Sequence, residues 1–214
     1  MDKKYELIES DIKGLYRIKA LKDFGYVKKG DIGGYVENPN NLSHKGNCWV
    51  YNNAKICDNA IIYGNAEVWD YAVIDGNARI YGNSQIRDCA VIDGNAQIHG
   101  DSEILNYAII RDNALIYGDS VISGNAFIGG YTEIKTGHNI GYIDEKFKNV
   151  LYIQCKASLI TVYTDINNVI KCNIGCQKRM TLEGLLKRIE EDGGMTKDRE
   201  EYVRIMQNAH LLLG

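Results

Sequence analysis

Two histidines have the chemistry of a general base, because a neutral imidazole accepts a proton near neutral pH. His99 occupies a position that neighbouring segments fill with tyrosine, so we interpret it as part of an aromatic column. His138 lies in the irregular stretch TGHNIG and is the better catalytic candidate, although a tolerated end residue is the simpler interpretation. His44 is interpreted as a loop residue and His210 as a packing residue. We therefore assign no catalytic residue and keep His99 and His138 as the alternatives.

The cysteines do not form a metal-binding pattern. The chain has six of them, at intervals set by a repeat or by strands and without a CxxC pair. Cys172 and Cys176 would need two further ligands to hold a metal, so we expect none. Small buried thiols in a reducing cytoplasm are the simplest interpretation. Because the sequence also lacks a Gly-rich phosphate loop and an HExxH motif, we expect no cofactor.

A repeat positions most of these residues. An eighteen-residue unit, itself three six-residue units, occurs five times between residues 53 and 142. An aliphatic residue recurs at every sixth position from Val50 to Ile140, sixteen times in succession, and a small residue usually stands two positions before it. Positions i and i−2 of a strand share a face, and the intervening Gly-Asn or Asp-Asn pairs mark turns. The pattern predicts triangular coils that stack as parallel strands about 4.8 Å apart.

The alternation of aliphatic, turn and small residues resembles that of the hexapeptide-repeat proteins. This resemblance covers about 90 residues and implies a left-handed parallel β-helix. The handedness comes from the resemblance alone, since the general rule for parallel crossovers favours the right hand. The segments LYRIKALKDFGYVKKGDIGGYVE and NLSHKGNCWVYNNAKI, together with the tail, also resemble a bacterial and prophage-associated family that combines a cap, such repeats and a short α+β tail.

The chain is expected to be mainly β and to have three parts. Residues 1–47 are an N-terminal β cap, because the first coil of a repeat stack exposes unpaired backbone. Residues 48–142 are the β-helix, and residues 143–214 are a small α+β C-terminal domain. In that domain, LYIQC, LITVYT and VIKCNI predict three strands. Thr181 is predicted to cap a first amphipathic helix, and a second one is predicted from about residue 197 to 213.

Outward positions eighteen residues apart stack into columns, and two columns are candidates for a binding surface. The aromatic column is a candidate stacking groove for a base or a sugar, although a self-stabilising ladder is the favoured interpretation. It consists of Tyr63, Tyr81, His99 and Tyr117. The second column is apolar where polar side chains are expected, and it has apolar residues at the preceding corner. We call it the apolar strip, and it consists of Val73, Val91, Ile109 and Phe127, with Tyr71, Cys89 and Tyr107 at the corner.

The apolar strip is interpreted as a contact surface, because contiguous exposed apolar side chains are uncommon on monomers. Another copy of the chain is the leading occupant, since hexapeptide-repeat proteins are frequently trimers, and we expect a dimer or trimer. The chain's own tail and a foreign protein are the alternatives. Asp75 and Asp93 align beside the strip with Arg111 above them, and we interpret them as a solvated rim.

The charge distribution restricts the partners. Residues 55–135 hold eleven Asp or Glu against five Lys or Arg, so we do not expect the repeat body to bind nucleic acid directly. Such an acidic rod could instead imitate a nucleic-acid surface. No segment has the pattern of a signal peptide or a membrane span, so we expect no membrane partner and a cytoplasmic location.

The sequence favours a non-enzymatic protein-binding or scaffold function. The prophage association of the similar family suggests an inhibitor of a host factor, such as a defence component. The alternative is a hexapeptide-repeat acyltransferase that uses coenzyme A or a nucleotide-sugar substrate, with His99 or His138 as base. Such enzymes typically have an extruded loop and a groove between subunits, whereas this repeat runs without an insertion.

Overall fold

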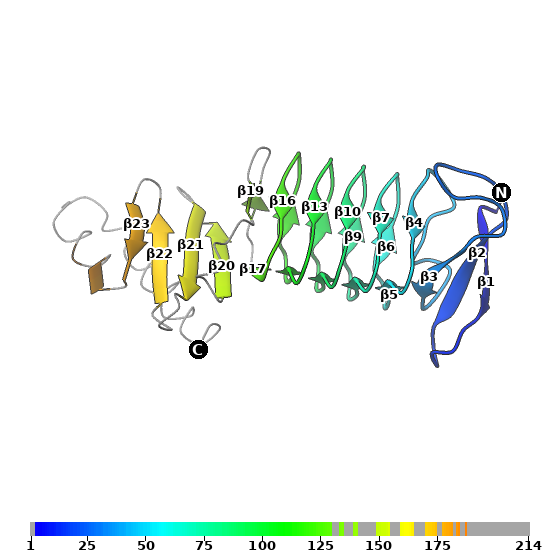
Figure 1. Cartoon of the computed structure of the whole chain (residues 1–214), viewed down its shortest axis with the longest axis horizontal. Helices are drawn as coiled ribbons and strands as arrows, with labels where there is room; N and C mark the ends of the chain where they lie inside the picture. Colours follow the sequence, from blue (N-terminus) through cyan, green and yellow to red (C-terminus); the bar gives the residue numbers. More distant parts are fainter. Residues whose placement is uncertain are drawn as a thin grey trace.

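The chain forms a parallel β-solenoid of about five coils, with about eighteen residues in each coil. The structure is a computed structural model, and it describes residues 3–129, 133–134, 139–140, 149–154, 159–164, 170–174, 177–181, 183–184 and 187. The molecule is elongated, with the N-terminal strands at one end of the solenoid and four further strands at the other (Figure 1). The described residues are mainly β, as the sequence predicts.

The strands fall into three groups along the chain. The N-terminal group comprises β1 (Tyr5–Glu9), β2 (Tyr16–Ala20) and β3 (Ile32–Val36). The solenoid group comprises β4 (Trp49–Val50), β5 (Lys55–Ile56), β6 (Ile61–Ile62), β7 (Glu67–Val68), β8 (Val73–Ile74), β9 (Arg79–Ile80), β10 (Gln85–Ile86), β11 (Val91–Ile92), β12 (Gln97–Ile98), β13 (Glu103–Ile104), β14 (Ile109–Ile110), β15 (Leu115–Ile116), β16 (Val121–Ile122), β17 (Ala126–Ile128), β18 (Glu133–Ile134) and β19 (Asn139–Ile140). The C-terminal group comprises β20 (Asn149–Gln154), β21 (Leu159–Thr164), β22 (Ile170–Ile174) and β23 (Gln177–Met180).

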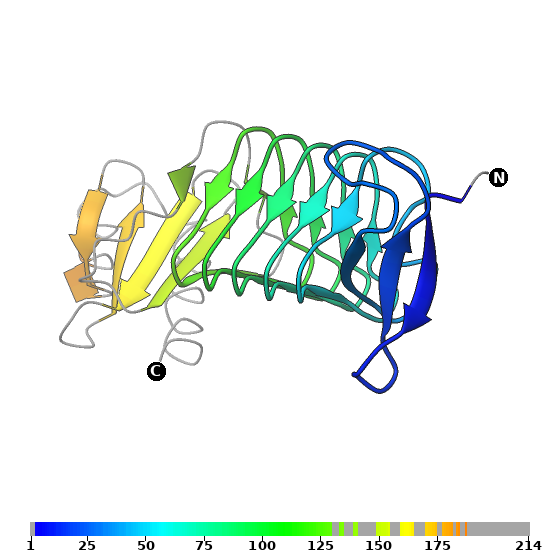
Figure 2. The same cartoon turned by 45° about the vertical axis from the view of Figure 1, so that its right-hand side comes forward.

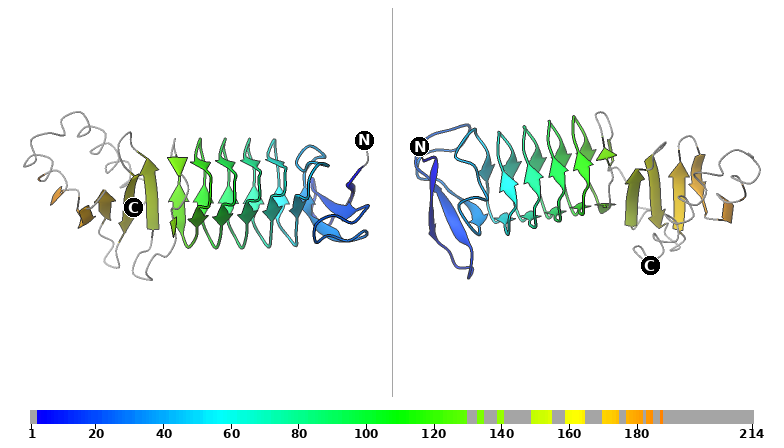
Figure 3. Two further views of the ribbon diagram at one scale, coloured as in Figure 1. Left: turned by 90° about the horizontal axis from the view of Figure 1, so that it is seen from above. Right: turned by 180° about the vertical axis from the view of Figure 1, so that it is seen from behind.

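Three sheets form the three faces of the coil. The six-stranded sheet has the order β19-β16-β13-β10-β7-β4, and the five-stranded sheet has the order β18-β15-β12-β9-β6. The third sheet has twelve strands and extends from the N-terminal strands through the solenoid to β23, in the order β1-β2-β3-β5-β8-β11-β14-β17-β20-β21-β22-β23. Its strands are parallel from β3 to β20 and antiparallel at both ends (Figures 2 and 3). The antiparallel ends continue the backbone hydrogen bonding of this sheet beyond the solenoid, where an edge strand would otherwise expose unpaired groups.

The core is the inward column of aliphatic and small residues that the repeat predicts. Every aliphatic position from Val50 to Ile134 is at most 1% exposed, and the small residues that stand two positions before them, from Cys48 to Ala126, are equally buried. Three of these small residues are serines, and each hydroxyl donates to the backbone carbonyl three residues before it, at 2.8 to 2.9 Å. The buried hydroxyls are therefore satisfied, as buried polar groups must be. They belong to Ser84, Ser102 and Ser120.

The corners of the coil require backbone with positive φ, and these residues recur every six positions from Asn52 to Gly124. Glycine, asparagine and aspartate fill them, because these residues tolerate the left-handed region. At Gly82 the fit is also tight, since an added Cβ would lie 2.8 Å from the backbone nitrogen and oxygen of Gly100. Close stacking of the coils thus requires glycine at that corner.

Asparagine ladders join the coils at two of the three corners. Where the twelve-stranded sheet leads into the five-stranded sheet, the amide nitrogens of Asn59, Asn77 and Asn95 each donate to the side-chain oxygen one coil further along, at 3.0 to 3.2 Å. At the next corner, Asn65 donates to Asn83 and Asn83 donates to Asp101, at 3.1 and 2.8 Å. These exposed ladders add side-chain hydrogen bonds to those of the backbone.

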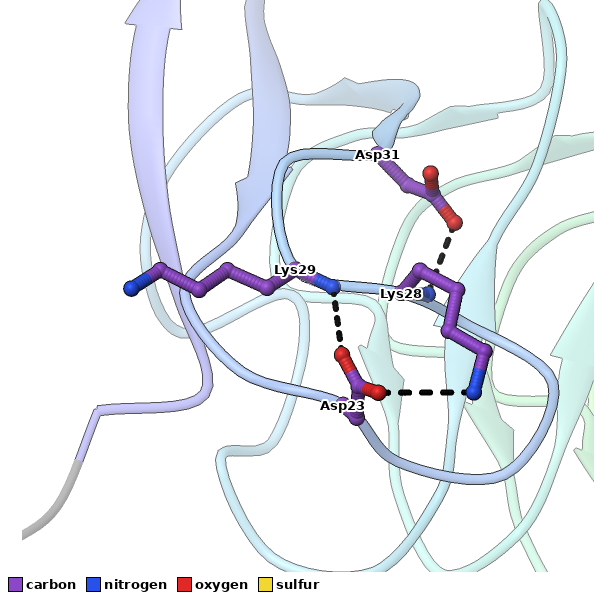
Figure 4. Close-up of polar contacts among 4 residues, drawn as sticks. All are labelled: Asp23, Lys28, Lys29 and Asp31. Carbon is purple, nitrogen blue, oxygen red and sulfur yellow. Dashed lines mark hydrogen bonds and ion pairs between the residues drawn. The ribbon is translucent and has the colours of Figure 1, made fainter.

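The N-terminal strands are fixed to the first coil by buried polar contacts. The ammonium group of Lys4 is buried, donates to the carbonyl oxygen of Cys48 at 2.8 Å and lies 4.9 Å from the ring centre of Phe24. The connection between β2 and β3 is held by carboxylates (Figure 4). Asp23 accepts from the backbone nitrogen of Lys29 and Asp31 from that of Lys28, both at 2.8 Å.

The C-terminal part agrees only partly with the sequence prediction. The three predicted strands are present as β20, β21 and β22, and β23 is a fourth strand that the sequence analysis did not predict. Thr181 caps a helical turn as expected, since its hydroxyl accepts from the backbone nitrogen of Gly184 at 3.1 Å. Residues 183, 184 and 187 are helical, whereas the predicted helix from about residue 197 to 213 lies outside the described residues.

Candidate functional site

The apolar strip forms one continuous row on the twelve-stranded sheet. Val91 is in register with Val73 on one side and with Ile109 on the other, and Ile109 is in register with Phe127. All four side chains are half-buried. The row continues from Phe127 onto Leu151 of β20, so this strand extends the sheet instead of folding back over the strip. The strip therefore lies on a flat face built by consecutive coils.

The corner beside the apolar strip differs from the other two corners. Here Tyr71, Cys89 and Tyr107 stand where the other corners carry the asparagine ladder, and all three are exposed. The two tyrosines are 64% and 65% exposed, which places them among the most exposed large side chains of the described residues. This exposure corrects the expectation of buried thiols for Cys89, and Cys57 is only half-buried, whereas Cys48 is buried as expected.

The coils at this corner are joined by hydrogen bonds at the preceding position. Asn52 donates to the carboxylate of Asp70 at 2.9 Å, and the backbone nitrogen of Asn106 donates to the carboxylate of Asp88 at 2.8 Å. The backbone nitrogen of Gly124 donates to the side-chain oxygen of Asn106 at 3.1 Å. Because the residues with positive φ carry the hydrogen bonds here, the next position is free for apolar side chains.

A further aromatic pair flanks the same corner on the six-stranded sheet. The rings of Tyr51 and Trp69 stack with their centres 3.5 Å apart, and the guanidinium carbon of Arg87 lies 5.9 Å from the ring centre of Trp69. The tyrosine hydroxyl and the indole nitrogen both donate to Glu67 at 3.3 Å. This pair was not predicted from the sequence, although the same eighteen-residue spacing that identified the other columns also aligns Tyr51, Trp69 and Arg87.

The charged residues beside the strip interact with one another. Arg111 lies 3.5 Å from the carboxylate of Asp93, and its guanidinium carbon is 5.9 Å from the ring centre of Phe127. Burial, with Asp93 and Asp58 nearby, raises the pKa of the Asp75 carboxyl above its ordinary value. The rim is thus an acidic row with one arginine, which also contacts the apolar strip.

The aromatic column is a stack on the five-stranded sheet. Ring centres lie 4.7 Å apart between Tyr63 and Tyr81, 4.6 Å between Tyr81 and His99, and 5.2 Å between His99 and Tyr117. The planes are within 16° of parallel, so each inner ring is covered on both faces. These distances are those of favourable aromatic stacking. Access to the column is therefore from the ring edges and from its two ends.

His99 lacks the surroundings of a general base. Its ring lies between Tyr81 and Tyr117, and burial lowers the pKa of the imidazole below its ordinary value. In the described part of the chain no side chain donates to or accepts from the imidazole, whereas a catalytic histidine is usually oriented by such a partner. His138, the other candidate, lies outside the described residues.

A cavity of about 550 Å³ opens at the Tyr63 end of the aromatic column. One wall is the loop that contains Leu42, His44 and Lys45, and the other wall carries Tyr63 and Arg79 from the five-stranded sheet. From the sequence, His44 is interpreted as a solvated loop residue, and the cavity is not predicted. No periodic signal could have located it, because the loop precedes the repeat.

Within the described ranges there is no cluster of three or more His, Cys, Asp or Glu side chains that could hold a metal ion. The side chains of Cys172 and Cys176 lie outside the described residues. Over the same ranges, no helix has the length and apolar character needed to cross a membrane.

The sequence matches no protein-family model and no curated protein.

Proposed function

We propose that this protein is a non-enzymatic protein-binding scaffold of the hexapeptide-repeat superfamily. The apolar strip and the corner beside it form the binding surface in this proposal. The observation that carries the proposal is the change of hydrogen bonding at this corner. Two corners keep asparagine ladders, whereas this one carries exposed Tyr71, Cys89 and Tyr107.

The energetics of the corner support a binding role. Among the described residues, the hydroxyls of Tyr71 and Tyr107 make no hydrogen bond, so these side chains add little to the stability of a single chain. Large exposed aromatic side chains are instead typical of protein interfaces, where tyrosine, tryptophan and arginine contribute most of the binding energy. Trp69 and Arg87 lie on the other side of the same corner, which extends the proposed surface over two faces of the coil.

We propose a second copy of this chain as the first partner. The strip is a straight row on a rigid sheet, and a self-complementary row of this kind can form a symmetric interface. The resemblance to hexapeptide-repeat proteins, which are frequently trimers, supports the same proposal. The similarity to a prophage-associated family extends it to a host protein, whose inhibition in the cytoplasm would be the biological role.

The test is a variant in which the corner regains its asparagine ladder. The triple substitution Tyr71→Asn, Cys89→Asn and Tyr107→Asn should leave the fold intact, because Asp-Asn pairs such as Asp112-Asn113 already occur at another corner. Sedimentation equilibrium should show a dimer or trimer for the native chain and a monomer for the variant. A matched control is Gln97→Asn with Leu115→Asn, at outward positions of the five-stranded sheet.

A pull-down from host lysate with the same three proteins distinguishes the two partners. If the native chain is monomeric but captures a host protein that the triple variant loses, the surface binds a foreign partner. A native monomer whose captured proteins are the same for the triple variant and the control would contradict the proposal.

A further inference from the structure

The cavity beside Tyr63 has a rigid wall. The side-chain oxygen of Asn41 accepts from the backbone nitrogens of Glu37 and Asn38, and its amide nitrogen donates to the carbonyl oxygens of Asp58 and Ala60, all at 2.8 to 3.1 Å. Asn41 is 1% exposed, so these four hydrogen bonds are buried and fix the loop to the second coil. A ligand that binds in the cavity would therefore not have to order the loop. The entropy loss of ordering a loop would not reduce the affinity of this ligand.

Tyr5 of β1 and the preceding residue Lys4 also hold this loop in place. The hydroxyl of Tyr5 donates to the carbonyl oxygen of Leu42 at 2.7 Å and lies 3.1 Å from that of Pro39. The ring of His44 lies 4.3 Å from that of Tyr5, and its Nδ1 accepts from the backbone nitrogen of Lys4 at 3.3 Å. Because Nδ1 is an acceptor, this contact assigns the proton of the neutral imidazole to Nε2, which makes Nε2 a donor.

The charge of the cavity is opposite to that of the repeat body. Lys45 and Arg79 line the cavity, and no aspartate or glutamate lines it. Within the described ranges, neither cationic side chain forms an ion pair or a hydrogen bond through its charged group. Residues 55–135 carry eleven acidic and five basic side chains, so a cavity lined by two cations and no carboxylate differs in charge from the repeat body. The cavity therefore favours an anionic group.

The cavity also presents the free face of an aromatic ring. Tyr63 is the first ring of the stacked column, and Tyr81 covers one of its faces with the planes within 8° of parallel. Leu42 pairs with Ile62, so the loop residue aligned with Tyr63 is Ser43, and no described ring covers the second face of Tyr63. A planar ligand in the cavity can extend the stack by one ring. Stacking on an exposed aromatic side chain contributes about 1–3 kcal/mol for a nucleobase.

We infer that this cavity is a binding site for a small molecule that joins a planar aromatic ring to an anionic group, as a mononucleotide does. The ring lies against Tyr63, and the anionic group faces Arg79 and Lys45. The site is separate from the apolar strip, because it lies on the five-stranded sheet and the strip lies on the twelve-stranded sheet. An aromatic carboxylate has the same two features, so the class of anion is a question for the experiment.

The experiment is isothermal titration calorimetry on the full chain with four probes. The probes are a purine mononucleotide, its nucleoside, inorganic phosphate and an aromatic monocarboxylate. We expect at least one of the two bifunctional probes to bind, and we expect the nucleoside and phosphate to bind at least about tenfold more weakly, since each lacks one contact. Raising the salt concentration should weaken the interaction, because Arg79 is exposed.

Variants locate the site. Arg79→Gln and Tyr63→Leu should each weaken binding roughly tenfold or more. Matched controls are Lys13→Gln and Tyr26→Leu, at exposed positions between the N-terminal strands that lie outside both the cavity and the proposed protein-binding surface, and they should leave binding unchanged. Circular dichroism and the melting temperature establish that each variant is folded. No binding by either bifunctional probe, equal binding by phosphate, or equal losses in the site and control variants would overturn the inference.

Discussion

At the scale of single residues, the central observation concerns His99. The imidazole is held flat between Tyr81 and Tyr117, and burial there disfavours its charged form. A ring in this position stabilises the column by stacking with both of its faces, and any aromatic side chain can make such contacts. The sequence predicted this arrangement from the column alone, because tyrosine occupies the same position in the adjacent coils.

The substitution His99→Tyr is predicted to preserve the fold and to reduce its sensitivity to acid. The pKa of His99 is lower in the folded chain than the ordinary value of 6.5, so the unfolded chain binds more protons as the pH falls through that value. This contribution to stability is present at neutral pH and is lost as the pH falls from 6.5 towards the lower folded-state pKa. Urea unfolding at pH 7 and pH 5 measures it.

The variant should lose less stability than the native chain over this interval. The stability that the variant still loses between pH 7 and pH 5 comes partly from His44, because burial and nearby lysines also lower the pKa of this histidine. Equal losses in the native chain and the variant would contradict the assigned effect of His99.

At the scale of the structural elements, the corners decide how closely the coils approach. The strands contain mostly two residues each, so the corners make up much of every coil. Two corners carry an asparagine ladder next to the position of positive φ, which holds glycine at every coil of one corner and glycine or aspartate at the other. At the third corner, the residues with positive φ make the side-chain hydrogen bonds between coils. The next position makes no such hydrogen bond, so exposed tyrosines can occupy it.

Gly82→Ala is predicted to destabilise the solenoid. The φ angle of Gly82 is 74°, and the new Cβ would lie 2.8 Å from the backbone of Gly100. The left-handed conformation alone costs of order 1–3 kcal/mol for a residue with a side chain, and the close approach adds to it. Thermal or urea unfolding measures the loss.

Gly14→Ala is the matched control. Gly14 also has a positive φ, of 85°, but an added Cβ meets no atom within 4 Å there. The control should therefore show only the conformational cost. If Gly82→Ala were no more destabilising than Gly14→Ala, the approach of the coils would not restrict this corner.

At the scale of the whole molecule, the twelve-stranded sheet is the connecting structure. It joins the N-terminal strands, every coil and the C-terminal strands, and the other two sheets are confined to the solenoid (Figure 1). In such a stack each coil packs only on its neighbours, so a local defect should spread outward from one coil. The central aliphatic residues, at 0% exposure, are where a defect matters most.

Ile92→Ala is predicted to reduce the free energy of unfolding by about 2–5 kcal/mol, because it removes buried methyl groups and leaves a cavity. Hydrogen exchange should accelerate most in β8 and β14, the strands on either side of β11. The matched surface control is Gln97→Ala, which should change stability by no more than about 0.5 kcal/mol. Uniform acceleration through β1 to β3 would contradict this local spread.

The sequence by itself determined the coil, its core and the columns on its surface. A six-residue period fixes which residues point inward, so the burial of Val50 to Ile134 and the stack from Tyr63 to Tyr117 follow from spacing alone. Only the tertiary structure decided how the non-periodic segments meet the coil. The loop around His44 is placed by hydrogen bonds from Asn41 and Tyr5. Because residues distant in the sequence make these contacts, no local pattern predicts the cavity at Tyr63.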